Sequence, residues 1–324
     1  MLGIPQVVSP AKCDDHHAGS LRRREQDEGV YLPASPSTMT EPLRPAPSRP
    51  ISGPVVVVVL DGVGTGRRDE GDAVHLARTP VMDRLDASSP RTTLLAHGTH
   101  VGMPSDDDMG NSEVGHNALG AGRIFDQGAK RVDNAIRSGV LFDPESDTSD
   151  TWQRIVARHD GGDGTLHLVG LLSDGNVHSH IDHVEALVRR AHAAGVSRTR
   201  LHALLDGRDV DGQSALTYVD GIERVFAELN DDGGDHRIAS GGGRMLVTMD
   251  RYEAEWEMVE TGWKAHVLGE GPETPSATAA IRAAREKKPS LNDQYIPPFV
   301  VVEDGAPVGT IEDGDSVILF NFRG

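Results

Sequence analysis

The strongest constraint on the fold is a strand–helix–strand pattern in the middle of the chain. Residues 165–175 (TLHLVGLLSDG) form an apolar run that ends in an acid and a glycine, and residues 200–209 (RLHALLDGRD) do the same. Between them, residues 182–195 carry apolar side chains at helical spacing. Strand, helix and strand at these lengths predict a parallel βαβ unit with a right-handed crossover. The chain is therefore expected to be an α/β protein.

The upstream sequence continues this alternation of strands and helices. A valine-rich run at residues 55–60 leads into Asp61 and predicts a buried central parallel strand. Residues 79–87 have helical apolar spacing, with Thr79 as the expected cap and Pro80 at the first helical position. The sequence thus predicts a second strand-to-helix unit before the central one.

Further elements are expected on both sides of the central unit. They are a strand at 91–98, helices at 129–139 and 218–229, and short strands joined by Asp-Gly turns over 295–322. The number of elements predicts two domains. Residues 1–53 are expected to be a disordered extension, because nine of the 19 prolines fall at or before Pro54 and no apolar period is present.

Composition excludes several classes of function. The net charge of −18 argues against nucleic acid as a partner, since phosphate backbones require a basic surface. No long uncharged apolar run predicts a membrane span. Cys13 is the single cysteine, so an intrachain disulfide and a thiolate metal site are excluded, and a cytoplasmic location is expected. Only five of the 32 basic residues are lysines, which favours a halophilic source.

Polar side chains follow several of the predicted strands. Ligands of open α/β sheets bind beyond the carboxyl ends of parallel strands, so these side chains are candidates for a binding site. They are Asp61 after the first strand, Asp174, His178 and His180 after the second, Asp206, Arg208 and Asp209 after the third, and Arg323 after the last. A single acid before glycine is also a common turn signal, so each carboxylate alone has a local explanation.

The loop that begins at Asp61 allows two interpretations. Residues 61–66 (DGVGTG) follow a predicted strand, as a dinucleotide-binding loop would. Their spacing differs from the dinucleotide motif, however, and Asp61 would direct a negative charge toward a pyrophosphate. A carboxylate at the end of a central strand favours a divalent metal ligand instead.

Ser112 lies in a glycine-rich stretch, MGNSEVGH, that precedes a helical pattern. At the start of a helix, backbone N–H groups would favour an alkoxide or a phosphoester on the serine, which supports a nucleophile. The alternative is an N-cap serine with Glu113 in the first turn. His116 is expected to make structural hydrogen bonds.

Several longer motifs resemble one enzyme family in the same order along the chain. From about residue 54 to the last residue, the sequence is similar to cofactor-independent (2,3-bisphosphoglycerate-independent) phosphoglycerate mutases. The motifs are VVVLDGVG, LARTPVMDRL, MGNSEVGHNALGAGR, LVGLLSDGNVHSHIDH, LHALLDGRDV, GGGRMLVTMDRYEAEWEMVE and FNFRG. The resemblance implies interconversion of 3-phosphoglycerate and 2-phosphoglycerate through a phosphoserine intermediate.

The resemblance also implies an architecture. In this family an alkaline-phosphatase-like domain is interrupted by an inserted α/β phosphotransferase domain. Residues 54–126 would then be the N-terminal part of the phosphatase domain, and residues 127–324 the phosphotransferase domain that binds the substrate.

The site residues follow from positions inside the matching motifs. The resemblance implies that Ser112 is the phosphorylated nucleophile, that Asp209 moves the hydroxyl proton, and that Asp61 and Ser112 are ligands of Mn²⁺, with two ions in the complete family site. The residues implied to hold the substrate are His178, Arg208, Asp209, Arg244, Arg251 and Arg323. Guanidinium groups suit a substrate that carries both a carboxylate and a phosphate.

Two departures from the family pattern qualify these expectations. Arg244 and Arg251 are separated by one residue more than in the usual motif, and the remaining metal ligands of the family would follow Gly324. We therefore expect a truncated, inactive form without turnover, and a monomer. The alternatives are a non-catalytic fragment that binds phosphoglycerate and another metal-dependent phosphotransferase of the alkaline phosphatase superfamily.

Overall fold

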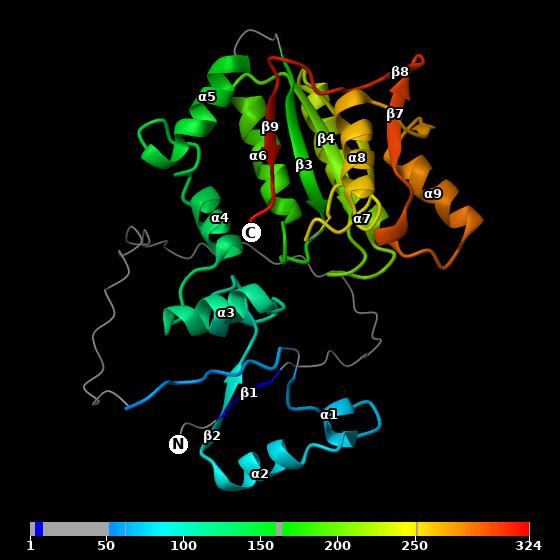
Figure 1. Ribbon diagram of the computed structural model, residues 1–324. Coiled ribbons are helices and arrows are strands. Elements are labelled where there is room, and N and C mark those ends of the chain that lie inside the picture. The colour runs from blue at the N-terminus through cyan, green and yellow to red at the C-terminus, as the bar shows by residue number, and fades with distance from the viewer. Residues whose placement is uncertain (1–3, 9–51, 62, 160–163, 251, 324) are drawn as a thin grey trace, which may run out of the picture. The chain divides into compact units, whose positions relative to one another are not determined.

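The computed structural model describes residues 4–8, 52–61, 63–159, 164–250 and 252–323 (Figure 1). The chain divides into two compact units, Met1–Leu94 and Leu95–Gly324, and each is described by itself. The division predicted at residues 126/127 therefore stays a prediction. Most of the predicted disordered segment, residues 9–51, lies outside the described residues.

The first unit contains two short helices, α1 (Ala73–Leu76) and α2 (Pro80–Ser88), and a two-stranded sheet of β1 (Ile4–Val8) and β2 (Arg91–Leu95). β1 differs from the disorder expected for residues 1–53. The predicted helix is confirmed as α2, with Thr79 at the N-cap and a proline in the first turn. The predicted strand at 91–98 is confirmed over residues 91–95 as β2, whereas Gly98 begins a 3₁₀ turn.

The prediction of a buried central strand at residues 55–60 is wrong. These residues form no strand, and their side chains are exposed, from 49% at Leu60 to 80% at Val57. A central strand needs hydrogen-bonded neighbours on both edges. Among the described residues of the first unit, the β1–β2 pair does not include this segment. Valine-rich composition alone therefore did not produce a strand.

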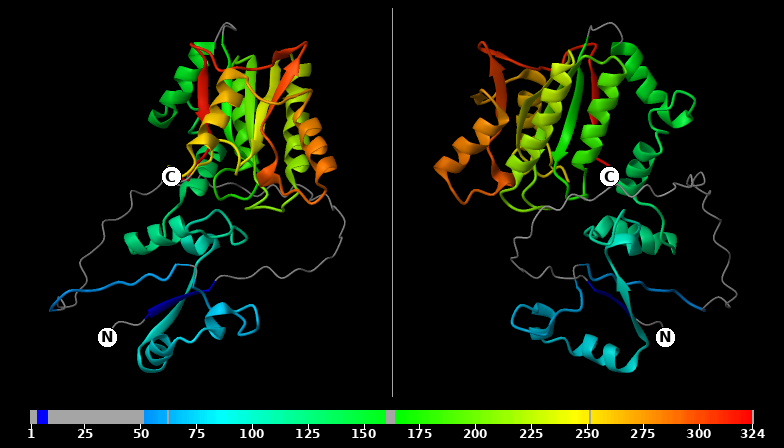
Figure 2. Two further views of the ribbon diagram at one scale, coloured as in Figure 1. Left: turned by 45° about the vertical axis from the view of Figure 1, so that its right-hand side comes forward. Right: turned by 180° about the vertical axis from the view of Figure 1, so that it is seen from behind.

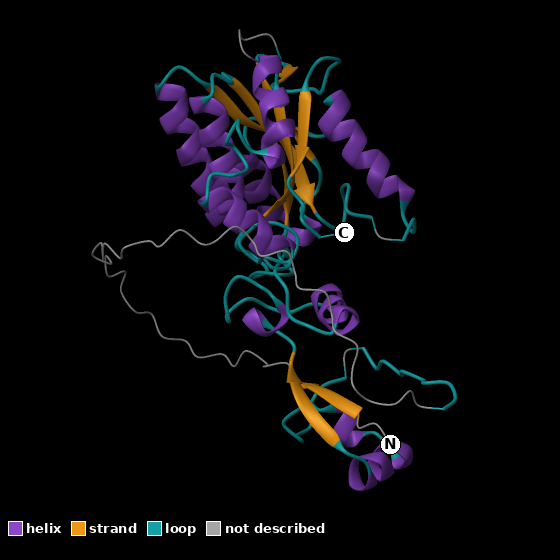
Figure 3. Cartoon of the chain, turned by 90° about the vertical axis from the view of Figure 1, so that its left-hand side faces the viewer, coloured by secondary structure: helices purple, strands orange, loops and turns teal. Residues whose placement is uncertain are grey.

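The second unit is built on a seven-stranded mixed sheet with helices on both faces (Figures 2 and 3). The strand order is β6-β7-β5-β4-β3-β9, and β8 pairs with β7. The strands are β3 (Leu166–Leu172), β4 (Arg198–Leu205), β5 (Asp235–Gly243), β6 (Glu273–Thr274), β7 (Phe299–Glu303), β8 (Ala306–Pro307) and β9 (Ser316–Leu319). The predicted α/β fold is confirmed.

The predicted βαβ unit is also confirmed. β3 and β4 are parallel and in continuous register, and α6 (Ile181–Ala193) connects them. The predicted turn at Asp304 and Gly305 joins β7 to β8, with φ angles of 51° and 79° that suit a two-residue hairpin. β9 lies parallel to β3 although about 150 residues separate them in sequence.

The two faces of the sheet differ in character. One face carries Leu168 and Leu201 into the main apolar core, which it shares with α6, α7 (Ala215–Asp231) and α9 (Ala277–Lys287). The alternate residues of the strands, including His167 and His202, point to the opposite face because side chains alternate along a strand. The other helices of the unit are α3 (Ser112–Ala121), α4 (Gly128–Arg137), α5 (Asp150–His159) and α8 (Trp256–Trp263), with the single turns η1 (Gly98–Val101), η2 (Asp147–Ser149), η3 (Lys264–Leu268) and η4 (Asp293–Tyr295).

Candidate active site

Four parallel strands end at the same edge of the sheet, and the residues after them carry most of the predicted substrate ligands. β3 leads into the loop with His178, β4 into the turn with Arg208 and Asp209, β5 into Arg244, and β9 into the segment with Arg323. This is the edge at which α/β sheets bind ligands. The topology therefore gathers side chains that lie far apart in the sequence.

Arg244 is the centre of this cluster and is 7% exposed. Its Nη1 donates to Asp206 Oδ1 at 2.8 Å and to Asp209 Oδ2 at 2.6 Å, and its Nη2 lies 3.1 Å from His178 Nε2. Burial opposes the guanidinium charge, but the hydrogen bonds and ion pairs with Asp209 and Asp206 outweigh it and raise the pKa of Arg244. Arg244 thus stays charged and in a fixed orientation.

The hydrogen bonds around His178 determine its tautomer. A guanidinium can only donate, so His178 Nε2 accepts from Arg244. His178 Nδ1 then carries the proton and donates to Asn321 Oδ1 at 3.2 Å. Burial, followed by the nearby charge of Arg244, lowers the pKa of His178. The ring is therefore neutral and holds the Nδ1–H tautomer.

Asp206 organises the turn after β4. Its carboxylate is 2% exposed and accepts from the Ser173 hydroxyl at 2.7 Å and from the backbone N–H groups of Arg208 and Asp209 at 3.1 and 3.0 Å. Together with Arg244, these donors satisfy a buried charge that would otherwise be costly. The sequence placed Asp206 at a strand end without assigning it a role, because an acid before glycine also reads as a turn.

Ser112 is the first residue of α3. The cap of this helix is Asn111, whose side chain accepts from Val114 N at 3.2 Å, so the alternative of an N-cap serine is wrong. His116 Nδ1 lies 2.7 Å from the Ser112 carbonyl and 3.2 Å from its Oγ. Since a carbonyl only accepts, His116 Nδ1 carries the proton and cannot take one from the hydroxyl. His116 is thus a structural hydrogen bonder, as expected.

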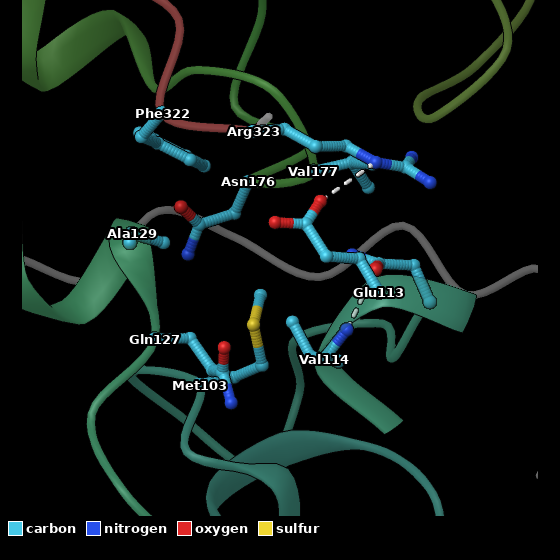
Figure 4. Close-up of a pocket in the computed structure, with 11 residues that line it drawn as sticks. Met103, Glu113, Val114, Gln127, Ala129, Asn176, Val177, Phe322 and Arg323 are labelled. Atoms are coloured by element: carbon cyan, nitrogen blue, oxygen red, sulfur yellow. Dashed lines mark hydrogen bonds and ion pairs between the residues drawn. The ribbon is translucent and has the colours of Figure 1, made fainter. Parts of the chain in front are cut away.

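Glu113 and Arg323 form an ion pair next to Ser112. Arg323 Nε lies 3.2 Å from Glu113 Oε2, and both side chains are partly buried. They border a shallow hollow that is open to solvent and is also lined by Met103, Gln127 and Asn176 (Figure 4). The pair lies between the residue predicted to be the nucleophile and the end of β9.

The remaining predicted residues are placed as follows. Arg208 has an exposed side chain beside the Asp206 turn. Arg251 lies outside the described residues. Asp61 belongs to the first unit and Ser112 to the second. Among the residues that the structure describes, no group of three or more His, Cys, Asp or Glu side chains is arranged to hold a metal ion.

Known proteins resemble this chain in sequence and in structure. Residues 132–324 match the family model for the BPG-independent PGAM N-terminus. Curated relatives named 2,3-bisphosphoglycerate-independent phosphoglycerate mutase include proteins of Trypanosoma brucei brucei, 54% identical over 83% of this chain and 48% of the relative, and of Zea mays, 51% identical over 86% and 49%. A solved structure of Leishmania mexicana phosphoglycerate mutase, described at low cobalt concentration, matches with a TM-score of 0.75 and 49% identity, over 82% of this chain and 48% of that one. The chain spans about half the length of the curated relatives it matches.

Proposed function

The chain belongs to the 2,3-bisphosphoglycerate-independent phosphoglycerate mutase family, and we propose that it binds 3-phosphoglycerate and 2-phosphoglycerate for their interconversion. The predicted fold class, a partial alkaline-phosphatase-like domain followed by an α/β phosphotransferase domain, agrees with this membership. The family model covers residues 132–324, within the range predicted for the phosphotransferase domain.

The convergence of His178, Asp209 and Arg244 at one sheet edge carries the proposal. Arg208 has its exposed side chain at the same edge, and Arg323 follows the parallel strand β9. Phosphoglycerate presents a carboxylate and a phosphate, and planar guanidinium groups bind both kinds of anion through paired hydrogen bonds. The two ends of a three-carbon acid would therefore be held by different arginines.

Substrate binding would require an exchange of ion-pair partners. Arg323 is paired with Glu113, and Arg244 with Asp206 and Asp209, so each guanidinium already has a carboxylate neighbour. An incoming phosphate or carboxylate would replace Glu113 on Arg323. Asp206, buried and held by three other donors, would stay in place and keep Arg244 oriented.

In the proposed reaction, Ser112 is the acceptor of the phosphoryl group. The bond from phosphorus to the substrate oxygen breaks, the bond to Ser112 Oγ forms, and the serine proton is transferred to the glycerate oxygen, with Asp209 as the proposed carrier. Return of the phosphoryl group to the other hydroxyl reverses these steps. The position of Ser112 at the start of α3 supports this role, because the helix dipole favours negative charge there.

The metal is proposed to be Mn²⁺, which would lower the pKa of the serine hydroxyl and neutralise phosphate charge. The described residues do not fit such a centre by themselves. The two proposed ligands, Asp61 and Ser112, would provide fewer oxygen atoms than the six that Mn²⁺ commonly takes, and the described ranges hold no group of three or more His, Cys, Asp or Glu side chains arranged for a metal ion. No step is therefore assigned to a metal in these 324 residues. The second candidate function is binding of phosphoglycerate without turnover.

Other features of the proposal rest on composition. No helix among the described residues is long and apolar enough to cross a membrane. We propose a cytoplasmic location, a halophilic source and no nucleic acid partner, on the basis of the single cysteine, the few lysines and the net charge of −18.

Calorimetric titration with 3-phosphoglycerate tests the binding proposal. Arg208→Ala should weaken binding roughly tenfold or more, because it removes charge-assisted hydrogen bonds. Arg282→Ala is the matched control, since Arg282 is an exposed arginine on α9, away from the sheet edge. Equal affinity of both variants would refute the proposed site.

A separate assay tests turnover. Purified chain with Mn²⁺ and 3-phosphoglycerate should produce no 2-phosphoglycerate while binding persists. Formation of 2-phosphoglycerate would overturn the prediction that the chain is inactive, but it would agree with the proposed binding site. In that case, mass spectrometry should find one phosphoryl group on Ser112, and its absence would count against the phosphoserine intermediate.

A further inference from the structure

A line of buried and partly buried polar side chains crosses the face of the sheet opposite to the main core. It runs from Asp315, just before β9, through His167 on β3 and His202 on β4 to Ser240 on β5, and then through His266 in η3 to Thr248. His167, His202 and Ser240 are each 0% exposed, and His266 is 4% exposed. We call these six residues the histidine relay.

A β-bulge brings Ser240 into the relay. β4 and β5 pair Leu201 with Ile238 but His202 with Ser240, so one residue of β5 is extra at this point. In a regular strand, residues two positions apart lie on the same face of the sheet, so Ile238 and Ser240 would share a face without the extra residue. The bulge lets Ile238 join the apolar core while Ser240 points to the histidines.

Every link of the relay has hydrogen-bond geometry. His167 Nε2 lies 3.1 Å from Asp315 Oδ2, and His167 Nδ1 lies 2.9 Å from His202 Nε2. Ser240 Oγ lies 2.7 Å from both His202 Nδ1 and His266 Nδ1, and His266 Nε2 lies 3.0 Å from Thr248 Oγ1. The chain of contacts is continuous from the carboxylate to the threonine hydroxyl.

The carboxylate determines where each proton lies. Asp315 also accepts backbone N–H groups from Thr165 and Glu312, which favours its ionised form, so His167 must donate to it through Nε2. A neutral His167 then accepts at Nδ1, so His202 donates through Nε2 and accepts at Nδ1. Ser240 consequently donates to His202 and accepts from His266 Nδ1. His266 Nε2 is left to accept from the Thr248 hydroxyl.

The charged and titratable groups that face the relay are few. His202 is surrounded by His167, His266 and Arg200, while His167 also faces Asp315 and His159. The Arg200 side chain donates to the Val308 carbonyl and pairs with Asp235 rather than with a histidine. A second proton on His167 would place its Nδ1–H against the Nε2–H of His202. A second proton on His202 or His266 would instead require the hydroxyl of Ser240 or Thr248 to turn and accept.

The free end of the relay holds a strained residue. Thr248 has φ of 64°, a left-handed conformation that is rare for a β-branched side chain and persists only where neighbours hold it. Its backbone N–H donates to Met258 O at 3.1 Å, and its hydroxyl packs against Gly262, where an added Cβ would lie 2.1 Å from Oγ1. Thr248 belongs to the loop between β5 and α8, which carries Arg244 and, in sequence, Arg251.

We propose that the histidine relay makes Thr248 a positioning residue, which fixes the arginine-bearing loop between β5 and α8 in the shape that binds phosphoglycerate. The role of the loop rests on the proposed function. The donor–acceptor order along the relay and its hydrogen bond to Thr248 follow from the geometry alone.

The first experiment tests the relay without a ligand. In the full chain at neutral pH, ring ¹⁵N shifts should show the Nε2–H tautomer at His167 and His202 and the Nδ1–H tautomer at His266. A different tautomer at any of the three, or an imidazolium, would overturn the relay. Because no substrate is present, this result is independent of the proposed function.

The second experiment tests positioning with three variants and 3-phosphoglycerate titration. Thr248→Val keeps the branched shape but removes the hydroxyl, and should weaken binding about fivefold, the equivalent of one hydrogen bond. Thr248→Ser keeps the hydroxyl and should bind like the parent chain. Ser240→Ala cuts the relay in the middle and should weaken binding to a similar extent.

The double variant Ser240→Ala with Thr248→Val tests whether the two residues act through one connected relay or through two independent contacts. Both changes break the same chain, so the double variant should bind no more weakly than either single variant. Additive losses, or an unaffected Ser240→Ala variant, would overturn the positioning role. If the parent chain binds no 3-phosphoglycerate, the proposed function and the positioning role both fail, while the tautomers still decide whether the relay exists.

Discussion

Acid should destabilise the second unit, and His266 should account for a defined part of the effect. Burial lowers the pKa of His266 from 6.5 to about 4. Between these values the unfolded chain binds a proton at this position and the folded chain does not. The free energy of unfolding therefore has its full value above pH 6.5 and falls as the pH drops toward 4.

The size of the effect follows from the width of the pH interval. From pH 6.5 to 5.0, one histidine with this pKa shift removes about 2 kcal/mol, at 1.36 kcal/mol for each pH unit. His266→Gln abolishes this titration. It should cost about 1 kcal/mol at pH 7.5 through weakened hydrogen bonds. The parent chain should therefore lose its advantage as the pH falls below 6.5, and at pH 5.0 the variant should be the more stable by about 1 kcal/mol.

Urea unfolding followed by tryptophan fluorescence measures this difference in the right part of the molecule. All three tryptophans, Trp152, Trp256 and Trp263, lie in the second unit. His100→Gln is the matched control, because it makes the same replacement at an exposed histidine of the same unit. A His266→Gln variant that loses stability with acid as steeply as the parent would refute the reasoning.

Three further substitutions probe buried charge and close packing, each measured by urea unfolding. Asp206→Asn weakens the pairing of buried Arg244 and should cost about 3 kcal/mol; a loss below about 1 kcal/mol would contradict its organising role. Asp293→Ala leaves Arg285 without its 2.6 Å partner and should cost about 3 kcal/mol, whereas an unchanged midpoint would show that the pair is dispensable. Gly241→Ala places a methyl group 2.4 Å from a β4 carbonyl and should cost about 1–3 kcal/mol; tolerance would mean that the strands can separate there.

The candidate site was predictable from sequence only in part. The acid and arginine after β4 and the histidine after β3 follow apolar runs, and such runs mark where a buried strand ends. Arg244 and Arg323 were predicted as substrate ligands because they lie in longer motifs that resemble those of the family. The organising role of Asp206 was not predictable, because its four donors come from Ser173 just after β3, from its own turn and from Arg244.

By itself, the sequence determined the local elements of the βαβ unit, α2 and the helical stretch after Ser112, because apolar periodicity and capping residues act within a few neighbouring positions. Only the tertiary structure decided that β9 joins β3, that residues 55–60 form no strand, and that a bulge in β5 turns Ser240 toward two histidines. Strand pairing and buried hydrogen bonds depend on partners distant in the chain. Apolar periodicity predicts that a side chain is buried, but it does not predict which distant residues pack against that side chain.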